Sequence, residues 1–180
     1  MSDTTKPLPE LDEATLAFAG RIFQFARAGQ ADELAPLLQQ GLPANLRNDK
    51  GDSLLMLAAY HGHAEAVGLL LRHGADANLP NDRGQTPLTA AAFKGDEACA
   101  RLLLEHGADA NGAGEGGRTP LIVAAMFDRV AILEMLLAQG ADPGARDSGG
   151  VTAEGAARLM GAMEAPDLLA RVAGSHQRNR

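Results

Sequence analysis

A period of 33 residues runs through most of the chain, and it constrains the fold more than any other sequence feature. One series of glycines follows this period, and each glycine comes shortly after a pair of leucines. Its members are Gly41, Gly74, Gly107 and Gly140. A second series keeps the same period and consists of Ser53, Thr86, Thr119 and Thr152. Because two independent series share one period, the sequence predicts an array of repeated units from about residue 20 to about residue 165.

Each unit carries the start and stop residues of two short helices. A serine or threonine can cap the first helix, and Pro87 and Pro120 follow two of these caps, where the fixed backbone angle of proline suits a first turn. A third series of glycines ends the first helix, with Asp128 in place of its fourth member. Its glycines are Gly29, Gly62, Gly95 and Gly161. The polar, glycine-rich links at 78–84 and 111–117 predict a hairpin-like finger between units.

Two stretches bring this pattern close to a known family. One reads Thr86-Pro87-Leu88-Thr89-Ala90-Ala91, and residues 102–111 read Leu-Leu-Leu-Glu-His-Gly-Ala-Asp-Ala-Asn. With the period of 33, the chain resembles the ankyrin-repeat family over roughly 150 of its 180 residues. The resemblance implies an all-α solenoid of helix-turn-helix units joined by hairpin-like fingers. Met56, Thr89 and Ile122 replace the usual histidine of the family motif, so its side-chain hydrogen bonds are not expected here.

The pattern weakens at both ends of the chain, which predicts capping units. We expect about five units, three of them complete, in a repeat domain over residues 12–173, with mobile tails at 1–11 and 174–180. Pro166 is expected to interrupt the last helix. The apolar side chains expected to cover the first interface are Phe18, Ile22, Phe23 and Phe25.

The composition excludes several classes of function. A net charge of −7 and an isoelectric point near 5.1 argue against nucleic acid as the main partner, because phosphate binding relies on a dense positive surface. No stretch approaches the 18 or so apolar residues needed to cross a membrane, and the first residues lack the apolar run of a signal peptide. The single cysteine, Cys99, cannot form an internal disulfide and occupies a core position of the repeat. A reducing, cytoplasmic setting is therefore predicted.

Two patterns could carry chemistry, and the repeat explains both. Residues 112–119 have the glycine spacing of a phosphate-binding loop, but Arg118 stands where lysine is required and Pro120 removes a backbone donor. His73 and His106 are equivalent in neighbouring units, about 10 Å apart, too far to share one zinc ion. The remaining histidines are His61, His63 and His176. We therefore expect no catalytic residue, no cofactor, no metal site and no enzymatic activity.

Two columns of large side chains are the strongest indication of function. The first column consists of Arg27, Tyr60, Phe93, Met126 and Leu159. The second consists of Ala28, His61, Lys94, Phe127 and Met160. In ankyrin proteins the residues just before the helix-ending glycine and those at the finger tips commonly contact the partner. We therefore predict that Tyr60, Phe93, Met126 and Phe127 anchor a partner, with local packing beneath the next finger as the alternative.

Charged residues at the finger tips are expected to form a polar rim around these anchors. The predicted rim residues are Asp49, Lys50, Asp82, Arg83 and Arg118. Such a rim would set orientation and association rate, whereas ordinary solvated loop charge is the alternative. The sequence thus predicts a non-catalytic module, monomeric, that binds a protein partner on the concave face of the array. The alternative is a structural or chaperone-like stabiliser whose columns meet a second copy.

Overall fold

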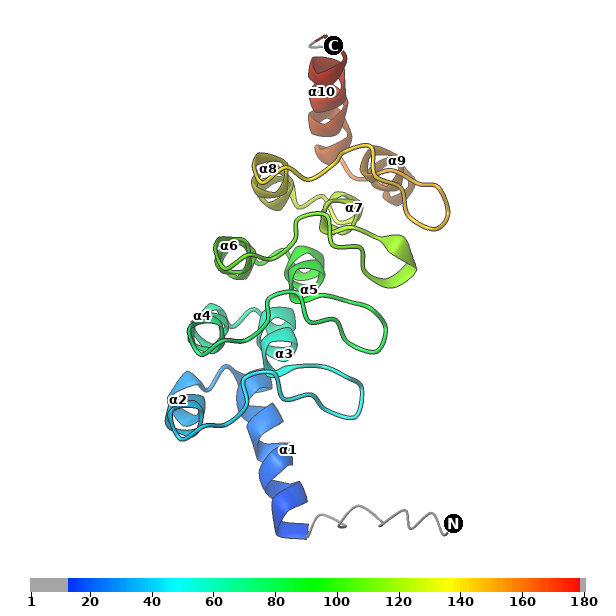
Figure 1. The fold of residues 1–180 in the computed structure, drawn as a ribbon. Helices are drawn as coiled ribbons and strands as arrows, with labels where there is room; N and C mark the ends of the chain where they lie inside the picture. Colours follow the sequence, from blue (N-terminus) through cyan, green and yellow to red (C-terminus); the bar gives the residue numbers. More distant parts are fainter. Residues whose placement is uncertain (1–12, 179–180) are drawn as a thin grey trace, which may run out of the picture.

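The computed structural model describes residues 13–178, with side chains described up to residue 174. In this part of the chain, successive helices form five pairs that stack one on the next, and no strand is present (Figure 1). The inner row of the stack consists of α1 (Glu13–Ala28), α3 (Leu54–His61), α5 (Pro87–Lys94), α7 (Pro120–Met126) and α9 (Ala153–Met160). The second helices are α2 (Ala31–Gln39), α4 (Ala64–Arg72), α6 (Glu97–Glu105), α8 (Val130–Ala138) and α10 (Ala165–Arg178). The predicted all-α repeat solenoid is confirmed.

The predicted capping residues begin four of the inner helices. The Ser53 hydroxyl accepts a hydrogen bond from the N–H of Met56 at 3.0 Å, and Thr86, Thr119 and Thr152 cap their helices in the same way. In α5 the Thr89 hydroxyl also accepts from the N–H of Thr86 at 2.9 Å, which completes a capping box. A side-chain hydrogen bond therefore does form at this position, although threonine replaces the family's histidine.

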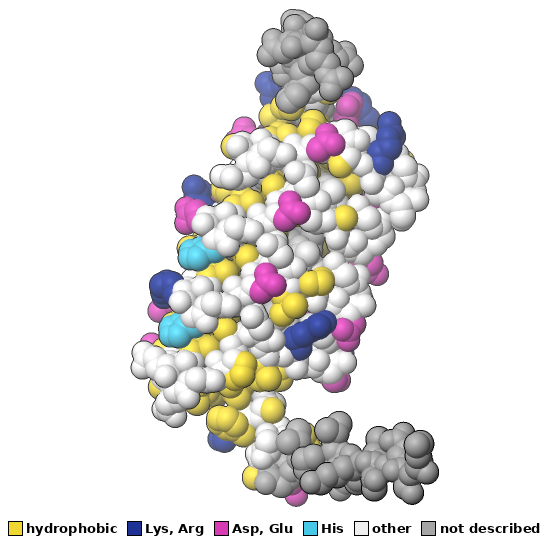
Figure 2. Space-filling model, in the orientation of Figure 1, with side chains coloured by type: hydrophobic (Ala, Val, Ile, Leu, Met, Phe, Trp, Pro, Cys, Tyr) yellow, Lys and Arg dark blue, Asp and Glu magenta, His cyan; other side chains and the backbone are white. Residues whose placement is uncertain are grey.

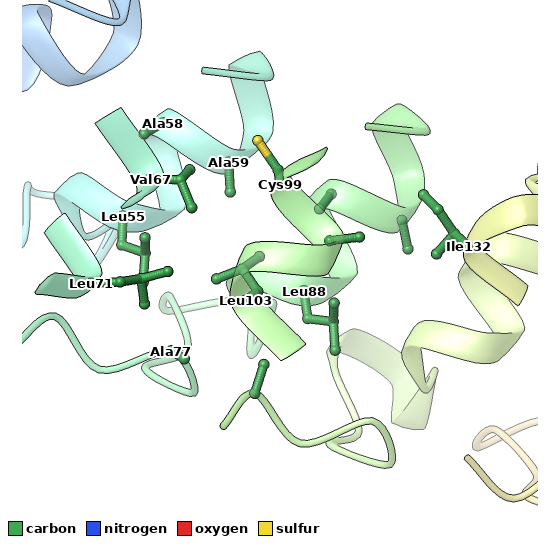
Figure 3. Close-up of a cluster of buried hydrophobic side chains, with 14 of the residues drawn as sticks. Leu55, Ala58, Ala59, Val67, Leu71, Ala77, Leu88, Cys99, Leu103 and Ile132 are labelled. Carbon is green, nitrogen blue, oxygen red and sulfur yellow. The ribbon is translucent and has the colours of Figure 1, made fainter. Parts of the chain in front are cut away.

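The core lies between the two rows of helices and between neighbouring units. Its largest fully buried side chains include Leu55, Leu70, Leu88 and Leu103, and small alanines fill the inner row. Figure 3 shows side chains of successive units in this core, among them Cys99, which is buried as predicted. Because alanine carries only one methyl group, adjacent inner helices can approach closely, and each unit buries the face of the one before it.

The fingers are hairpin-like loops, as predicted, and they extend from the same side of the stack (Figure 1). In the first finger the N–H of Asn48 donates to the carbonyl of Asp52 at 3.0 Å, and the next finger repeats this bond between Asn81 and Gln85 at 2.9 Å. Neighbouring fingers are joined by a bond from the N–H of Asp82 to the carbonyl of Lys50 at 3.2 Å. The third finger contains a short 3₁₀ turn, η1 (Glu115–Gly117). The fingers therefore form a connected rim.

A ladder of asparagine side chains joins the bases of successive units. Asn78 donates from its amide to the carbonyl of Gly107 at 3.0 Å and accepts from the N–H of Asp109 at 2.7 Å. Asn45 and Asn111 make the same pair of bonds one unit before and one unit after. Each amide thus satisfies one donor and one acceptor of the following unit, which fixes the spacing of the stack.

The two ends differ from the expectations in three respects. Ile22 and Phe23 are buried and Phe25 partly so, but Phe18 is 41% exposed and lies outside the first interface. The prediction that Pro166 interrupts the last helix is wrong, because α10 begins at Ala165 and proline is tolerated in a first turn. Helix α10 also continues to Arg178, past the boundary expected at residue 173. The expected tail over residues 1–11 lies outside the described residues.

Candidate functional site

A groove of about 550 Å³ runs between the inner helices and the fingers. Helices α3, α5 and α7 supply its floor, and the first three fingers supply one wall. The apolar lining consists of Met56, Leu57, Tyr60, Ala90, Phe93, Val123, Met126 and Phe127. The uncharged polar lining consists of Asn81, Gln85, Thr89 and Gly114. All four predicted anchors therefore line one continuous surface, on the side of the stack from which the fingers extend.

Three aromatic rings from successive units form a chain along the groove. The rings of Tyr60 and Phe93 are nearly parallel, with centroids 6.1 Å apart, and Phe93 meets Phe127 edge to face at 4.8 Å. These are the separations at which aromatic pairs attract. The Tyr60 and Phe93 side chains nevertheless remain 43% and 40% exposed, whereas Met126 packs partly against the core. The rings thus hold one another in place while presenting apolar surface to solvent.

Cationic side chains flank the aromatic floor. Lys50, Arg83 and Arg118 reach the groove from the first three fingers, and Arg27 reaches it from the end of α1. The acidic lining consists of Asp52 and Glu115. Three of the five predicted rim residues therefore lie at the groove.

Asp49 and Asp82, which were also expected at the rim, do not line the groove. Asp82 instead receives a hydrogen bond from the guanidinium of Arg47 at 2.9 Å, in an exposed ion pair that links two fingers. Arg47 also donates to the carbonyl of Gly51 at 2.9 Å, a hydrogen bond within its own finger. The carboxylate of Asp82 thus joins two fingers and does not contribute to the groove.

His61 lies at one end of the aromatic chain, against Tyr60, with ring centroids 5.2 Å apart. Burial lowers the pKa of His61 below its ordinary value of 6.5, and the positive charges of His63, Lys94 and Arg27 act in the same direction. The ammonium of Lys94 lies 5.8 Å from the centre of the Tyr60 ring, within reach of a cation–π interaction. This end of the groove is therefore positively charged even before His61 takes a proton.

Several lining residues were not predicted from the sequence. Leu57, Ala90 and Val123 precede the first column by three residues, which is one helical turn. The same spacing that defines the column could have identified them. Asn81 and Gln85 could not be identified in this way, because their side chains turn inward to bond to each other and to neighbouring finger residues.

The other candidate sites have structural roles. The stretch 112–119 forms the third finger, and Gly116 and Gly117 adopt the left-handed conformation that its turn requires. His73 and His106 each donate from Nδ1 to a carbonyl in the last turn of their own helix, at 2.9 and 2.8 Å. The predicted structural role of these two histidines near helix ends is confirmed.

The remaining candidates show no reactive arrangement. Burial, together with the neighbouring carboxylate of Asp96, raises the pKa of the Cys99 thiol to about 12, so little thiolate forms at neutral pH. Within the described range, no group of three or more His, Cys, Asp and Glu side chains is placed to hold a metal ion. The side chain of His176 lies outside the described residues.

None of the described helices combines the length and the apolar character needed to cross a membrane.

Comparison with known proteins agrees with the architecture. Residues 22–113 and 55–147 each match the family description "Ankyrin repeats (3 copies)", and together they cover more than half of the chain. A curated protein of Pseudomonas aeruginosa, named as an ankyrin repeat protein, is 61% identical over 59 residues. That match covers 33% of this chain and 34% of the relative, so the chain matches only about a third of the relative's length. The chain belongs to the ankyrin-repeat family.

Proposed function

We propose that this protein binds a protein partner in the groove between the inner helices and the fingers, without catalysing a reaction. Ankyrin repeats are generally protein–protein interaction modules, which supports the class of function. The observation that carries the proposal is the chain of rings Tyr60, Phe93 and Phe127. Two of these rings keep about two fifths of their surface exposed although the core beside them is closed. Aromatic side chains of this kind are frequent interface anchors.

The groove also meets the physical requirements of a docking surface. Backbone hydrogen bonds between fingers and the asparagine ladder beneath them hold the rim in place. Little conformational entropy would therefore be lost when a partner binds. The groove combines exposed rings on its floor with hydrogen-bonding groups such as Asn81 and Gln85 in its finger wall. The single buried cysteine fits a reducing compartment, and we place the interaction in the cytoplasm.

The test is capture of proteins from a lysate of the source organism. The triple variant Tyr60→Ala, Phe93→Ala, Met126→Ala removes the floor, and circular dichroism checks that the array still folds. The control variant Arg101→Ala, Glu105→Ala, Glu134→Ala changes three exposed residues on the outer helices α6 and α8. We expect a protein that wild type and control retain and the groove variant loses. Equal retention by all three proteins would refute the groove as the binding site.

Self-association is the second candidate, and the exposed apolar side chains at the C-terminal end of the two columns favour it. Leu159, Met160 and Met163 are 77%, 54% and 83% exposed near the C-terminal end of the stack. Large exposed apolar side chains on a folded protein often contact another molecule. Light scattering over a range of concentrations, with wild type and a Leu159→Ser, Met163→Ser variant, tests this candidate. A mass that stays at one chain for both proteins would exclude it.

A further inference from the structure

We propose that the occupant of the groove is a short, extended peptide segment that is acidic at one end and apolar at the other. This inference rests on the proposed function and adds the chemistry of the partner. The acidic end lies over the first units of the stack, and the apolar end lies over the last. The segment is recognised by four cations that form no ion pair or side-chain hydrogen bond among the described residues, and by the aromatic floor between them.

The unmatched cations are the first step of the argument. Within residues 13–178, the side chains of Arg27, Lys50, Arg83 and Arg118 form no hydrogen bond or ion pair with another residue of the chain. In the same part of the chain, the ion pairs that do form join Arg47 to Asp82 and Arg158 to Glu154, none of which lines the groove. The groove cations are therefore available to carboxylates of a partner.

The two acids of the groove are already engaged. Asp52 accepts from the amide of Asn81 at 2.9 Å and from that of Asn48 at 3.4 Å. Glu115 accepts from the amide of Gln85 at 3.3 Å. These neutral amides satisfy part of the hydrogen-bonding capacity of the carboxylates without adding positive charge. With four cations and two acids, the groove is positive within a chain whose net charge is −7. Figure 2 shows acidic and basic side chains interspersed over one face of the molecule, so an excess of cations in the groove is a local feature.

The groove cations reach from the first unit to the fourth, and among the described residues none comes from the last unit, which gives the segment its direction. Arg27 lies at the end of α1, and Lys50, Arg83 and Arg118 lie in the fingers before α3, α5 and α7. Beside Tyr60, Lys94 adds a further positive charge and His61 a titratable group. In the last unit the two columns continue as Leu159 and Met160, and the fourth finger carries the uncharged run 148–151. An acidic end is therefore favoured over the first units and an apolar end over the last.

The dimensions of the groove fix the length of the segment. The groove spans α3, α5 and α7, and the two columns continue to α9, so the segment crosses four inner helices. Packed helices lie about 10 Å apart, so this surface is about 30 Å long. An extended chain advances about 3.3 Å per residue, which makes the segment about nine residues long. A polyphosphate chain is disfavoured, because Asp52 and Glu115 lie among the cations and the floor offers apolar surface to be covered.

The test is fluorescence anisotropy with labelled peptides of about nine residues. One probe has a glutamate half followed by a half of leucine and phenylalanine; a second replaces each glutamate with lysine. We expect the acidic probe to bind wild type and the lysine probe to bind at least about tenfold more weakly. Equal binding of the two probes would overturn the inference. Displacement of the acidic probe by a single-stranded oligonucleotide at lower concentration than by unlabelled peptide would also overturn it.

Matched variants separate the local charge from the net charge. Lys50→Ala, Arg83→Ala, Arg118→Ala removes three groove cations, and Arg72→Ala, Arg101→Ala, Arg171→Ala removes three exposed cations elsewhere. The groove variant should bind the acidic probe about tenfold more weakly, with a reduced dependence on salt, whereas the control should bind nearly as wild type. Equal weakening of both variants would count against the inference.

A nitroxide at the acidic end of the probe tests the direction. Broadening of NMR signals near Lys50, rather than near Leu159, is expected, and the reverse would overturn the assigned polarity. Failure of this inference can be told apart from failure of the proposed function. If lysate capture still depends on the aromatic floor while the probe ignores the groove cations, only the chemistry of the partner is wrong. If capture ignores the floor, the proposed function itself fails.

Discussion

The two sides of the inner helices differ in how much their residues vary from one unit to the next. On the side packed against neighbouring units, Ala58, Ala91, Ala124 and Ala157 occupy one repeat position and are all completely buried. Two residues further along the same helices, the groove column changes from Tyr60 to Phe93, Met126 and Leu159. The buried position admits one small side chain because helices of adjacent units meet there, whereas the open position has no such limit. A repeat position that holds the same small residue in successive units therefore marks the packing surface. A position whose residue changes from unit to unit marks the surface left for a partner.

The largest effect on stability is expected from a substitution in the buried core. Leu103 is fully buried in α6, so Leu103→Ala should lower the free energy of unfolding by about 2–5 kcal/mol through lost burial and the cavity left behind. Urea denaturation followed by circular dichroism measures the change. The matched control is Leu159→Ala, because Leu159 is 77% exposed and its truncation should cost less than about 0.5 kcal/mol. Equal losses in the two variants would contradict the contrast between the two sides.

On the open side, the effect should fall on binding. Phe93→Ala removes the central ring of the aromatic chain and should weaken partner binding by at least about 2 kcal/mol, while helix content stays near that of wild type. Titration calorimetry with the captured partner measures the change. Phe18→Ala is the control, since Phe18 is similarly exposed at 41% but lies on α1 away from the groove. An unchanged dissociation constant for Phe93→Ala would remove this residue from the interface.

A smaller effect on stability is expected at Asp128, which replaces one of the glycines that end the first helix of each unit. Asp128 adopts a left-handed conformation with φ of 55°, and its carboxylate accepts from the N–H groups of Met163, Glu164 and Ala165 at the start of α10. Asp128→Gly relaxes the backbone but removes this cap, so it should cost about 0.5–2 kcal/mol. Asp128→Asn keeps an accepting oxygen and should cost less. Hydrogen exchange in α10 measures both, and a Gly variant as protected as wild type would contradict the capping role.

The same carboxylate predicts a dependence on pH. The hydrogen bond from Ala165 lowers the pKa of Asp128 below its ordinary value of 3.8, against a smaller opposing effect of burial. The stabilisation is therefore complete at pH values above 3.8 and is lost as the pH falls through the lowered value. Asp128→Gly should lose less stability on acidification than wild type. Denaturation curves at pH 5 and about pH 3 would reveal the difference.

The smallest effect should come from His61. Because its pKa lies below 6.5 in the free protein, His61 is mainly neutral at neutral pH. A bound carboxylate would raise that pKa, so affinity for an acidic segment should increase as the pH falls below 6.5, by about two- to fivefold. His61→Gln should flatten this increase. Anisotropy titrations between pH 7 and about pH 5 measure it, and an unchanged slope in the variant would exclude His61 as its source.

The fold could be predicted in detail because its determinants are local. Caps, helix-ending glycines and leucine pairs act within one unit, and the period of 33 repeats them. The ends were predicted less well. Proline in the interior of a helix kinks or breaks it, but Pro166 lies in the first turn of α10, where proline is tolerated. The candidate site was predicted in part. The anchors followed from the columns of the 33-residue repeat, but Asp82 lies outside the groove lining, because it pairs with Arg47 of a neighbouring finger.

The sequence by itself determined the repeat, the order of helices and fingers, and the two columns in which large side chains recur. Local hydrogen bonding and the size of side chains decide these features, and both can be read from residues close in the chain. Only the tertiary structure decided which finger charges face the groove, that Asn81 and Gln85 donate hydrogen bonds to its acids, and that Asp128 caps α10. These contacts join residues about one unit apart, and their geometry depends on how the units stack.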